Sequence, residues 1–136
     1  MKHKLTAFAI FSVITFIACT SNNKKAEQEI SEVAYNYCVA TSNYNIDSAA
    51  LFSTEEHTQT ALATARFLLQ YVDSAYIASD SPATITIKDV SVTTDTTAYA
   101  VYHKQTPIKD FVDTLDLCKE NGRWLVYTPA KNQRNR

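Results

Sequence analysis

The sequence predicts an α+β domain in which N-terminal helices pack on one face of a four-stranded antiparallel sheet. Apolar residues recur at helical spacing up to about residue 79, and at every second position after Pro82. Asn121-Gly122, a dipeptide typical of tight hairpins, separates the last two apolar runs. Helices followed by strands favour an α+β domain, and 136 residues is the length of one domain.

Two amphipathic helices are expected first. One spans residues 26–40, and the segment 41–47 breaks it with Ser and Asn side chains that compete for backbone hydrogen bonds. Ser53 has the features of an N-cap, with Glu56 completing a capping box, and the helix it starts ends at 79–82. We expect a wide buried face on this helix, made of Ala61, Leu62, Ala65, Leu68, Leu69, Val72 and Tyr76.

The strands are expected to form consecutive hairpins. The alternation of apolar residues slips between 87 and 90, which indicates a β-bulge at Lys88-Asp89. Residues 93–97 form a turn and 104–109 a loop. The four expected strands cover residues 85–92, 98–103, 111–118 and 124–127.

The N-terminus has the features of a secretory signal peptide. Lys2, His3 and Lys4 precede an apolar run, Leu5–Ile17, that is too short for a membrane span but typical of a signal peptide. We therefore assign residues 1–18 to a signal peptide.

The residues around Cys19 resemble the lipobox of bacterial lipoproteins. The apolar run ends in Ile17-Ala18-Cys19, and the resemblance implies that Cys19 carries acyl chains such as palmitate after cleavage. Residues 19–25 would then form a flexible polar tether. With no acidic cluster after Cys19, the resemblance favours a protein on the periplasmic side of a Gram-negative cell envelope. The alternative is a core cysteine in an N-terminal helix.

Composition excludes several classes of function. The net charge of −1 leaves no basic footprint for nucleic acid, and one glycine cannot build a phosphate-binding loop. The sequence has no Cys-x-x-Cys and no His/Cys/Asp cluster with metal-ligand spacing. We therefore expect neither a cofactor nor a metal, and no nucleic-acid partner.

The last predicted hairpin carries a family resemblance. Lys119, Gly122, Arg123 and Trp124 resemble the Lys-x-x-Gly-Lys/Arg-Trp motif of small bacterial lipoprotein domains with a nuclear-transport-factor-2-like (NTF2-like, or cystatin-like) fold. "NYNIDSAALFS" (43–53) is similar to the segment after the first helix of that family. The resemblance covers residues 26–128, leaving 129–136 as a basic tail.

That resemblance implies a curved sheet around a helix, often with a conical pocket. Some relatives are isomerases or dehydratases with an Asp or His base, and others only bind a ligand or partner. His103 and Asp113 fall on neighbouring expected strands, beside Tyr102, so a pocket with a His103–Asp113 pair is one hypothesis. The other is a solvated His and Asp on a polar face. His57 is expected at the surface.

Two cysteines remain after processing. Cys38 lies on the apolar stripe of the first helix and Cys118 on a central strand. An oxidising compartment permits a disulfide between them, while free buried cysteines would serve as small apolar residues.

The leading functional hypothesis is an envelope lipoprotein whose domain binds a small-molecule or protein ligand without catalysis. One alternative is an isomerase or hydrolase-like enzyme that uses His103 or Asp113. Another is a structural protein that forms a homodimer through the exposed sheet face.

Overall fold

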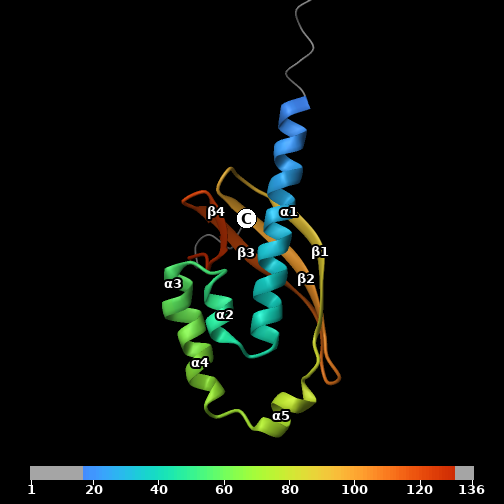
Figure 1. The fold of residues 1–136 in the computed structure, drawn as a ribbon, viewed down its shortest axis with the longest axis vertical. Helices are drawn as coiled ribbons and strands as arrows, with labels where there is room; N and C mark the ends of the chain where they lie inside the picture. The colour runs from blue at the N-terminus through green and yellow to red at the C-terminus, as the bar shows by residue number, and fades with distance from the viewer. Residues whose placement is uncertain (1–16, 131–136) are drawn as a thin grey trace, which may run out of the picture.

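The computed structural model describes residues 17–130, with side chains from residue 22 onward. Helices come first and the sheet follows, as expected for an α+β domain (Figure 1). The helical part contains α1 (Ile17–Ser42), α2 (Ile46–Ala50), α3 (Glu55–His57), the π-helical turn η1 (Thr58–Leu62), α4 (Ala63–Leu69) and α5 (Ser74–Ser79). The strands are β1 (Thr84–Val92), β2 (Thr97–Gln105), β3 (Asp110–Glu120) and β4 (Arg123–Val126).

The sheet is a meander of four antiparallel strands in the order β1-β2-β3-β4. The register between β1 and β2 shifts between Ile87 and Asp89, which confirms the predicted bulge. Asn121 and Gly122 both have positive φ, at 50° and 78°, which confirms the predicted tight turn between β3 and β4. The local sequence therefore sets both irregularities of the sheet.

Helix α1 begins well before the predicted start at residue 26. The residues expected as a flexible tether, 19–25, are helical in the structure. Extending a helix that is already formed costs little, and an exposed Lys25–Glu29 pair with 3.9 Å between its charged atoms supports the extension. At 1.5 Å per residue, α1 is about 39 Å long. The signal peptide lies almost wholly outside the described residues, as do residues 131–136 of the basic tail.

The second predicted helix is not continuous. Its N-cap is Thr54 rather than Ser53, with the Thr54 side chain accepting from the His57 amide. The π-helical turn η1 inserts an extra residue and rotates the apolar stripe that follows. Of the face expected to be buried, only Leu62 is buried, while Leu68 and Tyr76 are 55% and 42% exposed.

The core lies between α1 and the inner face of the sheet. Small residues let the helix approach the strands closely, since Ala34 on α1 and Ala98 and Ala100 on β2 are all buried. Leu117 and Val126 complete this layer from β3 and β4. Among the described helices, none is both long enough and apolar enough to cross a membrane.

The loop before α3 is fastened to the sheet. The amide of Val126 donates to the Phe52 carbonyl at 2.8 Å, and the Thr54 amide donates to the Val126 carbonyl at 2.9 Å. These bonds hold α3 and η1 beside β4, whereas α4 and α5 lie farther along the chain and toward the end of α1 that is distant from residue 17 (Figure 1).

Candidate functional site

The predicted His103–Asp113 pair is not formed. Successive side chains alternate between the faces of a strand, and His103 lies on the outer face while Tyr102 and Asp113 lie opposite one another on the inner face. His103 Nε2 instead contacts Asp110 Oδ1 at 2.6 Å, with the Asp110 side chain 62% exposed. This pair lies on the outer face of the sheet, with an exposed carboxylate and a His103 side chain that is 24% exposed.

Asp113 and Tyr102 do not form a catalytic arrangement by themselves. Asp113 is exposed and its Oδ1 accepts from the Thr114 amide at 2.7 Å. Tyr102 packs edge-on against Phe111, with ring centroids 6.3 Å apart. Burial, with a smaller contribution from Cys38 and Asp113, raises the pKa of Tyr102, so its hydroxyl stays protonated at neutral pH.

The two cysteines are both free and lie on opposite sides of the sheet. Cys38 is buried on α1 among the core residues, and burial raises the pKa of its thiol to about 12. Cys118 follows inward-facing Leu117 and therefore points outward, where its Sγ approaches Glu120 at 3.9 Å. The structure does not bring these cysteines together, because the sheet lies between them.

His57 is buried, contrary to the expectation of a surface position. Its Nε2 lies 2.9 Å from the Tyr37 hydroxyl and its Nδ1 lies 2.8 Å from Thr128 Oγ1. Burial lowers the pKa of His57, so the ring is neutral at pH 7. Burial also raises the pKa of Tyr37 to about 12. Both ring nitrogens are thus engaged with hydroxyl groups that bridge α1, α3 and the end of the sheet.

The most completely buried charged group is Asp80, which follows α5 and is 0% exposed. Its Oδ2 accepts from the Tyr44 hydroxyl at 2.7 Å and from Lys109 Nζ at 2.9 Å. Its Oδ1 accepts from Thr106 Oγ1 at 2.8 Å, and Lys104 Nζ lies 3.8 Å from Oδ2. We call these five residues the Asp80 cluster.

The electrostatics of the Asp80 cluster favour the ionised carboxylate. Burial alone would raise the pKa of Asp80, but hydrogen bonds from Tyr44, Lys109 and Thr106 outweigh it and lower this pKa to about 2. Lys109 also lies over the Tyr76 ring at 5.1 Å, and its interactions with Tyr76 and Asp80 raise its pKa. A carboxylate with so low a pKa is a poor proton acceptor at neutral pH, so the cluster has the chemistry of a structural clamp.

No protein-family model and no curated protein matches the sequence. Among solved structures, the fold is similar to an NTF-2 like protein of unknown function from Shewanella oneidensis MR-1, with a TM-score of 0.52 and 16% identity. The match covers 73% of this chain and 92% of that chain.

The chain has an NTF2-like fold. The likeness confirms the predicted α+β class with helices packed on a four-stranded antiparallel sheet. At 16% identity it establishes the fold alone, so the chemistry has to come from the side chains.

The hairpin motif of the NTF2-like domain is partly buried. Trp124 is 4% exposed and packs on the inner face, with Lys119 Nζ 5.6 Å from its ring centroid. Its indole Nε1 is the one buried side-chain N or O atom of the described residues without a hydrogen-bond partner. The motif therefore has a clear structural role in the core and the turn, and a less clear role in any functional site.

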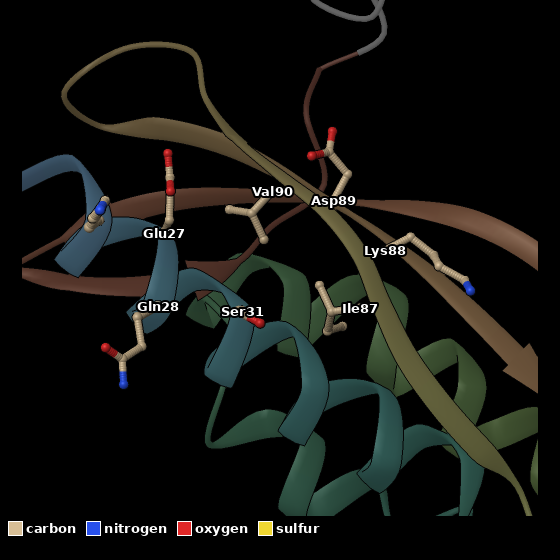
Figure 2. A pocket seen from close by; sticks show the side chains of 8 residues that line it. Glu27, Gln28, Ser31, Ile87, Lys88, Asp89 and Val90 are labelled. Atoms are coloured by element: carbon tan, nitrogen blue, oxygen red, sulfur yellow. The ribbon is translucent and has the colours of Figure 1, made fainter. Parts of the chain in front are cut away.

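The surface hollows of the NTF2-like domain are open and shallow. Figure 2 shows one between α1 and the bulge of β1, where Ile87 and Ser31 approach each other while the Lys88 and Asp89 side chains point away. Two further hollows flank Phe67, one of them bordered by Thr128. Within residues 17–130, no group of three His, Cys, Asp or Glu side chains could hold a metal ion.

Sequence reasoning missed both Asp80 and His57. The segment around Asp80 was interpreted only as a helix terminator, and the lysines that neutralise it are 24 and 29 residues away. No local signal marks such a cluster, because its members come from three separate connections of the fold and from the end of β2.

Proposed function

We propose that this protein is a lipid-anchored protein of the bacterial cell envelope whose NTF2-like domain binds another molecule without catalysing a reaction on it. The domain is the recognition part of the protein in this proposal. The N-terminal segment is the part that holds it at the membrane.

The observation that carries the binding assignment is that the buried ionisable side chains are already engaged. Both carboxylate oxygens of Asp80 accept hydrogen bonds, and both ring nitrogens of His57 contact hydroxyl groups. A general base must instead reach a substrate proton, directly or through one water. In the described part of the chain these groups support the fold, which favours recognition at the surface.

The anchor assignment is supported by the N-terminal sequence. An apolar run of signal-peptide length ends at Ile17-Ala18-Cys19, and a polar segment follows at once. Several acyl chains bury enough methylene groups to hold a protein firmly on a bilayer. Helix α1 would then carry the folded domain away from that membrane.

The anchor is tested with Cys19→Ser expressed in a Gram-negative host. The unaltered protein should fractionate with membranes and show the added mass of acyl chains on an N-terminal Cys19. The variant should accumulate as an unprocessed precursor without lipid. Normal processing and membrane fractionation of Cys19→Ser would contradict the anchor.

The binding assignment is tested by native mass spectrometry of the lipidated protein released from its own membranes. A reproducible adduct, either a small molecule or a protein, is the expected result. Turnover of a candidate small molecule that is lost in His57→Gln, while that variant stays folded by circular dichroism, would contradict a purely binding role.

A further inference from the structure

The surface of α4 has an unusual composition for an exposed helix. None of the residues of α4 is buried, although the sequence of this segment is strongly apolar. Phe67, Leu68 and Tyr71 are 56%, 55% and 73% exposed, and the Phe67 and Tyr71 rings contact each other at 5.4 Å between centroids. We call these three residues the α4 face.

Within residues 17–130, the α4 face is left largely uncovered. The other side of α4 packs against the core through Ala65 and Leu69, and the hollows on both sides of Phe67 are lined largely by small and uncharged residues such as Ala63 and Thr64. Clustered exposed apolar residues on a soluble domain commonly mark an interaction site. Aromatic side chains are also the residue type that contributes most to binding energy.

The surroundings of the α4 face are acidic. Between residues 43 and 79 the sequence carries four acidic residues, Asp47, Glu55, Glu56 and Asp73, and a single basic one, Arg66. That arginine is already paired with Asp47. Glu55 and Glu56 precede the face along the chain and Asp73 follows it, all three exposed. The exposed charges that flank the face along the chain are therefore negative.

Charge and position discriminate between three occupants. A second copy would bring the same carboxylates close to one another, which disfavours a close interface. A membrane with anionic headgroups would be repelled in the same way, and α4 lies toward the end of α1 that is remote from Cys19 (Figure 1). A basic segment with an apolar side would pair with the carboxylates that flank the α4 face and would cover its exposed apolar side chains.

We propose that the α4 face, formed by Phe67, Leu68 and Tyr71, is the docking site for a cationic amphipathic helix of a partner protein. This inference rests on the proposed binding function and names its surface and partner chemistry. Apolar residues at helical spacing on the partner would cover Phe67 and Tyr71. Its lysines or arginines would lie near Glu55, Glu56 and Asp73.

The test uses the lipidated protein in phosphatidylcholine nanodiscs, with empty nanodiscs as the blank. The probe is a fluorescein-labelled peptide of about 14 residues with leucines on one helical side and lysines on the other. Controls are a scrambled peptide of the same composition and a version with glutamates in place of lysines. Anisotropy should show binding of the Leu/Lys peptide at least about tenfold tighter than either control.

Matched variants locate the site. Phe67→Ser/Tyr71→Ser should weaken binding about tenfold or more, because it removes two exposed aromatic contacts. Val112→Ser removes an apolar residue that is 61% exposed on the far side of the sheet and should change the affinity less than about twofold. Glu56→Gln/Asp73→Asn should weaken binding and reduce its dependence on NaCl between about 50 and 500 mM.

Each of the following outcomes would overturn the inference. Equal binding by the Phe67/Tyr71 variant, with an unchanged circular dichroism spectrum, places the peptide elsewhere. Equal binding of the glutamate peptide removes the charge argument. A concentration-dependent dimer that is lost in the same variant makes a second copy the occupant. Absence of peptide binding up to about 100 µM refutes the surface assignment, while the native mass spectrum separately decides whether the domain binds anything.

Discussion

Replacing Asp80 by Asn tests whether its buried charge stabilises the fold. The substitution keeps the size of the side chain and removes the negative charge that Lys109 and Lys104 face at 2.9 and 3.8 Å. The pKa of Asp80 is lowered from 3.8 to about 2. Since one pKa unit corresponds to about 1.4 kcal/mol, the charged form contributes about 2 kcal/mol of folding free energy at neutral pH.

The expected loss is somewhat larger than that figure. Lys104 keeps only 13% of its side chain exposed, and a buried cation without its partner adds a further penalty. We therefore expect Asp80→Asn to lower the free energy of unfolding by about 2 to 4 kcal/mol at pH 7. Urea titrations followed by fluorescence of Trp124, the sole tryptophan, measure this difference directly.

The pH dependence separates charge from packing. A carboxylate with a lowered pKa stabilises the native state above its unfolded pKa, and this contribution disappears as the pH falls through the folded pKa. The difference in the free energy of unfolding between wild type and Asp80→Asn should therefore become smaller between about pH 4 and pH 2. Asp110→Asn, at an exposed carboxylate, should cost less than about 0.5 kcal/mol. A difference in unfolding free energy below about 1 kcal/mol at pH 7, or one that stays constant in acid, would refute stabilisation by the Asp80 charge.

Two further predictions concern His57 and Gly122. Because burial lowers the pKa of His57, the stability of the wild-type protein should fall as the pH drops below the ordinary histidine pKa. In urea titrations between about pH 7 and pH 5, the stability of His57→Gln should depend less on pH. An equal pH dependence in both proteins would contradict a buried neutral ring. Gly122→Ala should cost about 1 kcal/mol in thermal unfolding, since φ is +78° and no atom lies within 4 Å of the added Cβ, so the cost is conformational. An Ala variant as stable as wild type would show that the turn is not left-handed.

The features that sequence reasoning predicted are those that neighbouring residues determine. The bulge near Lys88 follows from a slip in the alternation of apolar residues, and the tight turn follows from Asn121-Gly122, which tolerates positive φ. The α+β order and the strand sequence follow from the change of periodicity after Pro82. Each of these signals extends over only a few residues.

The features that sequence reasoning missed depend on distant contacts or on a local change of helix type. Tyr44 and Asp80 are 36 residues apart, and His57 and Thr128 are 71 residues apart. The sequence around each residue therefore does not indicate its hydrogen-bond partner. The π-helical turn before α4 rotates the apolar stripe, and Leu68 and Tyr76, which were expected in the core, are exposed. His103 and Asp113 were placed on the correct strands, but their faces could not be matched without the register.

The packing of the domain explains why recognition at the surface is the stronger proposal. Ala34, Ala98 and Ala100 allow α1 to lie close against the inner face of the sheet. Two buried polar groups of the domain, Asp80 and His57, are already engaged by partners from the chain itself. Three large apolar residues outside this core, Phe67, Leu68 and Tyr71, are exposed together on α4 and just after it, and exposed carboxylates flank them along the chain. A partner that covers them gains hydrophobic burial and charge complementarity at once, without any rearrangement of the core.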